Sequence, residues 1–239
     1  MTASESPRID EDESAFDADS LVWPDAGTAR RLWHSRGHVE AILGQQELPA
    51  LPPALPEEAR GARDHADPEG YLLRRRAVRA LAAAVLDQAP EDFRITRSTA
   101  GAPCLAGTDL RISFSGRAPY SAILIARKPA GIDLEGLIRS DAIPWKVLRE
   151  DESRLLKALP PAQQGEAFIR LWSAKEAYAK ALGLGFLLPP ECLQVEPGGK
   201  ASFLPAPGQE PLPGGMIRTT GWRAGPGKTV IISLALLSS

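Results

Sequence analysis

A five-residue segment, GIDLE at residues 131–135, carries two carboxylates at a spacing that could support metal chemistry. Asp133 and Glu135 are two residues apart, and side chains two apart lie on the same face of a β-strand. A pair of acids on a strand face is often only solvated. Here the surrounding residues are apolar, and a buried strand carries charges only when another group pairs with them.

A second segment, WSAKEAYAK at residues 172–180, repeats functional side chains at every fourth position. Trp172, Glu176 and Lys180 therefore lie on one stripe of a helix. Glu176 and Lys180 could form an ordinary helical salt bridge, worth about 0.2–0.5 kcal/mol, and we expect Trp172 to be a packing anchor. Taken with the strand, the helix offers a third carboxylate and a lysine. Such a set could bind one divalent cation and a phosphate group beside it.

The two motifs together, in this order, resemble those of the 4′-phosphopantetheinyl transferases. The resemblance covers roughly residues 55–195. It fits the larger branch of the family, the surfactin-synthetase-activating type, whose single chain contains two similar halves. It implies transfer of the 4′-phosphopantetheine group from coenzyme A to a serine of an acyl or peptidyl carrier protein, with release of 3′,5′-ADP.

The resemblance also implies a role for each motif residue. Asp133, Glu135 and Glu176 would bind Mg²⁺, which prefers oxygen ligands and retains positions for phosphate and water. Glu176 or a metal-bound water would accept the proton of the carrier serine. Lys180 would neutralise the pyrophosphate and could protonate the leaving group. Lys175 matches the family's phosphate-contacting lysine.

Coenzyme A would be held largely by residues upstream of these motifs. Arg75 and Arg79 match the family's R-x-x-x-R helix, and Ser113 could donate a hydrogen bond. At two positions the chain departs from the family pattern: Ala102 stands where a lysine is usual, and Phe114 where a histidine is usual. Each charge-assisted bond to phosphate is worth about 1.5–3 kcal/mol, so we expect a weakened or rearranged phosphate pocket.

The elements that must position these residues mix helices with antiparallel hairpins, which indicates an α+β fold. The apolar periodicity predicts helices, strands joined as hairpins, and one long Pro/Gly-rich loop. We expect helices at 69–88 and 148–158, and a helix that contains Trp172 and ends at Gly183. Strands are expected at 93–97 and 110–115. One hairpin would join 120–126 to 131–135, and a second would end in a last strand at 229–237, after a loop at 197–215.

The domain organisation follows from composition and from the resemblance. Residues 1–20 are strongly acidic and are expected to form a disordered tail. The two-half architecture, which comes from the resemblance alone, assigns residues 21–128 to an N-terminal half that binds coenzyme A. Residues 129–239 would form the metal-binding, catalytic half, with the active site between the halves in a monomer.

Composition limits the classes of protein to which the chain could belong. The chain has 239 residues and a net charge of −2, which does not indicate a nucleic-acid-binding protein. It has only two cysteines, Cys104 and Cys192, and they lie far apart in the sequence. This argues against a disulfide framework and fits a reducing compartment. No apolar run approaches the roughly 18 residues needed to cross a bilayer, and the acidic N-terminus does not read as a secretory signal. We therefore expect a cytoplasmic protein without membrane partners.

Two alternatives remain open at this point. A degenerate relative could bind a carrier protein or coenzyme A without transfer, as Ala102 and Phe114 suggest. A generic α+β interaction module would be favoured if Asp133, Glu135 and Glu176 lay too far apart to share a cation.

Overall fold

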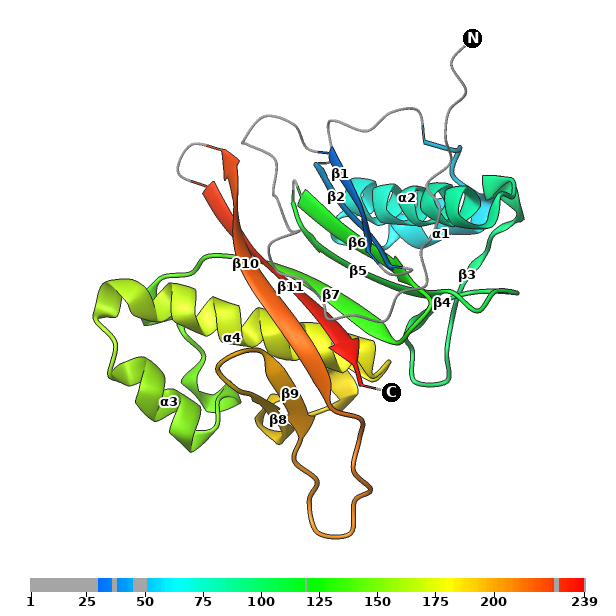
Figure 1. Ribbon diagram of the computed structural model, residues 1–239. Helices are drawn as coiled ribbons and strands as arrows, with labels where there is room; N and C mark the ends of the chain where they lie inside the picture. Colours follow the sequence, from blue (N-terminus) through cyan, green and yellow to red (C-terminus); the bar gives the residue numbers. More distant parts are fainter. Residues whose placement is uncertain (1–29, 36–37, 45–50, 119, 226–227, 239) are drawn as a thin grey trace.

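The computed structural model describes residues 30–35, 38–44, 51–118, 120–225 and 228–238, and the acidic segment 1–20 lies outside these ranges. Two antiparallel sheets stack against each other, and each carries a long helix on its outer side (Figure 1). The described part of the chain thus forms four layers: helix, sheet, sheet, helix. This arrangement confirms the predicted α+β class.

The first sheet has six strands in the order β1-β2-β6-β5-β4-β3. Its outer face packs against α2, whose first turn is capped by the Asp67 carboxylate accepting a bond from the Gly70 amide. Helix α1 lies beside α2. The bounds are β1 Arg30–Ser35, β2 His38–Gly44, α1 Pro56–Arg63, α2 Pro68–Leu86, β3 Ile95–Arg97, β4 Pro103–Leu105, β5 Arg111–Arg117 and β6 Tyr120–Ala126.

The second sheet has five strands in the order β7-β11-β10-β9-β8. Helix α4 crosses its outer face and α3 packs beside α4. The bounds are β7 Ala130–Gly136, α3 Glu150–Lys157, α4 Pro161–Ala181, β8 Leu193–Val195, β9 Lys200–Phe203, β10 Gly215–Gly225 and β11 Lys228–Leu237. Short 3₁₀ turns lie between the helices and strands of both sheets, at Pro90–Asp92, Ser140–Ala142, Trp145–Val147, Gly185–Leu187 and Pro190–Cys192.

The predicted hairpin between 120–126 and 131–135 is wrong. Strand β6 pairs with β2 and β5, whereas β7 pairs with β11, so the turn at 127–129 carries the chain from one sheet to the other. Nearly every residue of both strands is buried, because each strand packs against a helix on one face and the other sheet on the opposite face.

Most other expected elements are confirmed. Helices α2 and α3, and the end of α4 before Gly183, fall where the periodicity predicted them; Gly183 adopts φ 72°, a left-handed conformation that suits glycine. The predicted loop at 197–215 contains the short strand β9, which is a correction. Strands β1, β2 and β4 were not predicted. No helix in the described ranges combines the length and apolar character needed to cross a membrane.

Candidate active site

Strand β7 and helix α4 approach closely at Gly131, and this contact builds the centre of the site. A Cβ atom at Gly131 would collide with the Ala177 carbonyl oxygen and the Ala181 amide of α4. Without that atom, the last turns of α4 lie directly on β7. The Lys180 Nζ then reaches the Oδ1 atom of Asp133 at 2.6 Å.

Glu176 lies one turn before Lys180 on the same side of α4, and its side chain is buried. Burial raises the pKa of Glu176 to about 7; the Lys180 charge opposes the shift, and repulsion from Asp133 and Glu135 adds to it. Burial and the Asp133 charge also raise the pKa of Glu135. The strand and helix acids therefore lie near enough to repel one another.

Strand β5 of the other sheet supplies partners for both acids. The Ser115 hydroxyl donates to Asp133 Oδ1 at 2.9 Å, and Arg117 Nε donates to Glu135 Oε2 at 2.7 Å. Ser113 lies two residues before Ser115, on the same face of β5. Its hydroxyl accepts a hydrogen bond from the backbone amide of Ile132 in β7. The site thus lies where the two sheets meet.

Sequence analysis missed Ser115 and Arg117. The signal was nevertheless present, because Ser113, Ser115 and Arg117 alternate along one strand and must share a face. Without the pairing of the sheets, nothing indicated that this face would point at Asp133 and Glu135.

The acids fit a hard divalent cation, although they are not arranged as a finished metal site. Asp133 is 2% exposed, and its Oδ2 atom is buried without a hydrogen-bond partner in the described structure. An unpaired buried carboxylate oxygen beside two acids with raised pKa values would be stabilised by an oxygen-seeking cation. Within the described ranges, no three Asp, Glu, His or Cys side chains are already grouped to hold a metal. Lys180 and Arg117 supply the compensating charges instead.

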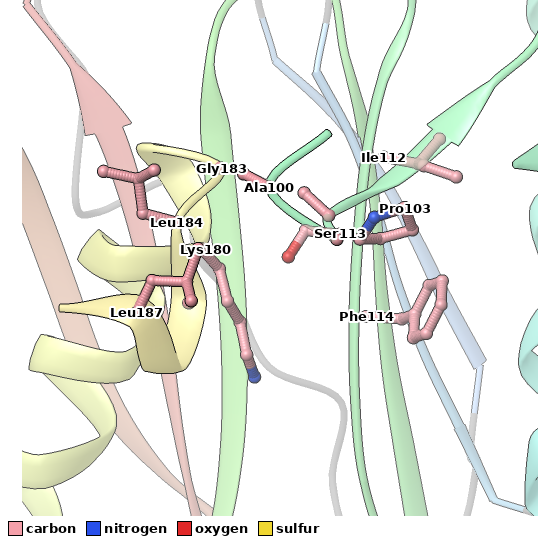
Figure 2. Close-up of a pocket in the computed structure, with 12 residues that line it drawn as sticks. Ala100, Pro103, Ile112, Ser113, Phe114, Lys180, Gly183, Leu184 and Leu187 are labelled. Atoms are coloured by element: carbon pink, nitrogen blue, oxygen red, sulfur yellow. The ribbon is translucent and has the colours of Figure 1, made fainter. Parts of the chain in front are cut away.

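A pocket of about 340 Å³ opens beside this cluster, and Lys180 points into it (Figure 2). Ser113 and Phe114 of β5 line one side, and the turn at residues 183–187 after α4 lines the other. Ala102 also lines the pocket, so both departures from the family pattern face this space. Its walls are mainly apolar, with Lys180 as the ionic side chain among the described lining residues.

A second pocket, of about 240 Å³, shares Pro103 and Phe114 with the first. Arg75 lines it and lies 3.5 Å from the ring centroid of Tyr71 and 5.7 Å from that of Phe114, in cation–π contact. Burial lowers the pKa of Arg75, but an arginine remains charged. Arg97 lines the same pocket, as do the acids Glu57 and Glu58. The pocket therefore combines guanidinium groups, carboxylates and aromatic rings.

Arg79, which the sequence predicts to contact coenzyme A, lines neither of these two pockets. Its side chain is fully buried, and its guanidinium bonds Glu58 and the carbonyl oxygens of Pro53 and Pro90. In this structure Arg79 links α2 to α1, to the segment before α1 and to the turn after α2.

Lys175, which the resemblance predicts to contact phosphate, also lines neither pocket. It is 1% exposed, and its Nζ donates to Glu152 Oε2 at 2.7 Å and to the Pro190 carbonyl at 2.9 Å. It links α4 to α3. Trp172 stacks on Phe168 with ring centroids 6.2 Å apart, which agrees with a packing role.

Comparison with known proteins gives the class of this region. Residues 129–212, the segment from β7 through α4 to β9, match the model of the 4′-phosphopantetheinyl transferase superfamily. This segment contains Asp133, Glu135, Glu176 and Lys180.

Curated relatives show the same similarity. The chain is 33% identical over 112 residues to a 4′-phosphopantetheinyl transferase of Bacillus subtilis, covering 46% of this chain and 49% of the relative. It is 29% identical over 157 residues to a putative 4′-phosphopantetheinyl transferase of Synechocystis sp., covering 61% and 59%. A holo-[acyl-carrier-protein] synthase of Geobacillus kaustophilus is 47% identical over 49 residues, covering 20% and 38%. The chain spans about half the length of the curated relatives it matches.

Proposed function

We propose that this protein is a magnesium-dependent enzyme that transfers the 4′-phosphopantetheine group of coenzyme A to a serine of an acyl or peptidyl carrier protein. The observation that carries the proposal is that Lys180, which lines the first pocket, bonds Asp133 and lies one helical turn after Glu176. These residues lie in the segment that matches the superfamily. Transfer would break the pyrophosphate bond, form a serine phosphodiester and release 3′,5′-ADP.

The carboxylates and the lysine divide the chemical work. Asp133, Glu135 and Glu176 would hold Mg²⁺, which would neutralise charge on the pyrophosphate oxygens. Glu176 or a metal-bound water would accept the proton of the carrier serine. Lys180, at the pocket wall, is placed to stabilise the negative charge that develops on the leaving phosphate.

Coenzyme A is long and anionic, and two adjoining pockets suit such a molecule. We place it across both, with Ser113 and Lys180 lining the first pocket and Arg75 lining the second. Arg79 and Lys175, which are buried in ion pairs, are assigned to structure rather than to this ligand.

The arrangement of the sheets supports the larger branch of the family and the proposed division at about residue 129. Strands up to β6 belong to one sheet and strands from β7 onward to the other, and each sheet has its own long outer helix. We propose that these are the two similar halves, joined in a monomer.

The test is the intact mass of an apo acyl carrier protein after incubation with this protein, coenzyme A and Mg²⁺. The proposal expects a gain of one phosphopantetheine group that disappears when EDTA is added. A gain that persists in EDTA would overturn the metal assignment. No gain on any fatty-acid, polyketide or nonribosomal-peptide carrier would overturn transfer itself.

A second candidate is a relative that binds a carrier protein or coenzyme A without transfer. It is favoured by one observation, that Ala102 and Phe114 present apolar surface to the pocket. Calorimetric binding of coenzyme A together with an unchanged carrier mass would select this candidate.

A further inference from the structure

Arg117 donates a hydrogen bond to each oxygen of the Glu135 carboxylate. Its Nε donates to Oε2 at 2.7 Å, and its Nη2 donates to Oε1. A bidentate guanidinium pair of this kind uses both carboxylate oxygens. Glu135 therefore has no oxygen left that is not already bonded to a cationic donor.

The two members of this pair differ sharply in exposure. The Glu135 side chain is 9% exposed, whereas that of Arg117 is 55% exposed at the end of β5. Arg117 can move into water at little cost, because an exposed guanidinium keeps its hydration. Glu135 cannot move with it, since β7 is paired with β11 and packed against α4.

We propose that Arg117 is an internal cation that occupies the Glu135 carboxylate in the metal-free protein and must turn outward before a divalent cation binds. This inference rests on the proposed function. It assigns Arg117 a positioning role: it neutralises Glu135 in the absence of metal and competes with the metal for the same two oxygens.

Lys180 is the other charge in the cluster, and it is placed differently. Its side chain is 23% exposed and bonds a single oxygen of Asp133, which leaves Oδ2 of that acid open. A cation can therefore approach Asp133 while Lys180 stays in place. At Glu135, a cation that chelates both carboxylate oxygens would take the place of the guanidinium, so this mode of binding and the Arg117 pair exclude each other.

Competition of this kind lowers the apparent affinity for the metal. The observed dissociation constant equals the intrinsic constant divided by the fraction of molecules in which Arg117 has turned away. Removing the guanidinium removes that factor. We expect Arg117→Gln to bind a divalent cation on the order of tenfold more tightly than the wild type.

The experiment measures Mn²⁺ binding to the metal-free protein by electron paramagnetic resonance of free Mn²⁺, without coenzyme A or carrier. Arg127→Gln is the matched control, because Arg127, directly after β6, is also a half-exposed arginine paired with an acid, Asp109. Arg117→Lys keeps the positive charge but loses the fork that bonds both carboxylate oxygens. This variant should therefore bind Mn²⁺ more tightly than the wild type but less tightly than Arg117→Gln.

The outcomes separate this inference from the proposed function. Tighter binding by Arg117→Gln but not by Arg127→Gln, abolished by adding Asp133→Asn, supports the inference. Equal or weaker binding by both Arg117 variants, with Mn²⁺ bound by the wild type, overturns it and leaves the proposed function intact. Failure of the wild type and of both folded variants to bind Mn²⁺ overturns the inference together with the metal assignment, whereas the carrier mass assay tests transfer independently.

Discussion

At the scale of single residues, Glu176 is the side chain on which the proposed chemistry depends most. Its carboxylate is buried beside two other acids, and the compensating charge comes from Lys180 one turn along the same helix. A carboxylate in this setting is costly to ionise without a cation, so burial here agrees with a functional role better than with a structural one.

Glu176→Gln should lower the rate of phosphopantetheine transfer by about 100-fold or more, because the amide can neither accept the serine proton nor contribute a charged metal ligand. The rate is measured from the carrier mass at saturating coenzyme A. Glu166→Gln is the control: Glu166 lies on the same helix in an exposed pair with Arg170 and should change the rate less than twofold. Comparable rates for both variants would refute the assignment of Glu176.

Glu176 should also make stability depend on pH in the metal-free protein. Its pKa of about 7 lies above the ordinary value of 4.5, so the folded state holds the proton more tightly. The resulting stabilisation is complete below pH 4.5 and is lost as the pH rises through 7. Between pH 5 and 8 the wild type should lose about 3 kcal/mol relative to Glu176→Gln.

Urea unfolding of both proteins in EDTA at the two pH values provides the comparison. The difference between the proteins isolates Glu176 from other titrating groups. A constant difference from pH 5 to pH 8 would mean that the pKa is not raised.

At the scale of elements, the contact between β7 and α4 sets the geometry of the site. Gly131→Ala should lower the free energy of unfolding by about 1–3 kcal/mol, because the new methyl group meets the backbone of α4 at Ala177 and Ala181. It should also displace Lys180 from Asp133 and reduce transfer. Thermal unfolding and the carrier assay measure the two effects.

Gly136→Ala is the matched control on the same strand, since a Cβ atom there has no neighbour within 4 Å. It should leave stability and transfer nearly unchanged. Equal effects of the two substitutions would show that the contact at Gly131 does not position α4.

The same elements show how far sequence carries the prediction. Helix periodicity located α2, α3 and the end of α4, and motif spacing selected Asp133, Glu135, Glu176 and Lys180. Strand pairing failed between 120–126 and 131–135, because burial of both faces looks the same in a hairpin and in two stacked sheets. Whether a cationic side chain is available to a ligand or pairs with a buried acid also depends on tertiary contacts. Arg79 and Lys175, for example, both pair with buried glutamates.

At the scale of the whole molecule, the two sheets share one core and should unfold together. Leu124 of β6 packs with Ile132 and Leu134 of β7 and with strand β11 across the sheet interface. Leu124→Ala should therefore cost about 2–5 kcal/mol. Tryptophan fluorescence and far-UV circular dichroism should report the same urea midpoint.

Leu155→Ala provides the control, because Leu155 on α3 is 70% exposed; it should shift the midpoint little. Separate transitions in Leu124→Ala, one for each sheet, would show that the halves are independent domains.

The central claim is that these sheets bring a carboxylate cluster and a lysine together to transfer phosphopantetheine. The most direct measurement follows carrier mass and 3′,5′-ADP release in one reaction of apo carrier, coenzyme A and Mg²⁺. The account predicts equal molar amounts of modified carrier and 3′,5′-ADP from the wild type and almost none from Glu176→Gln. An unmodified carrier throughout, with no 3′,5′-ADP released, would contradict it.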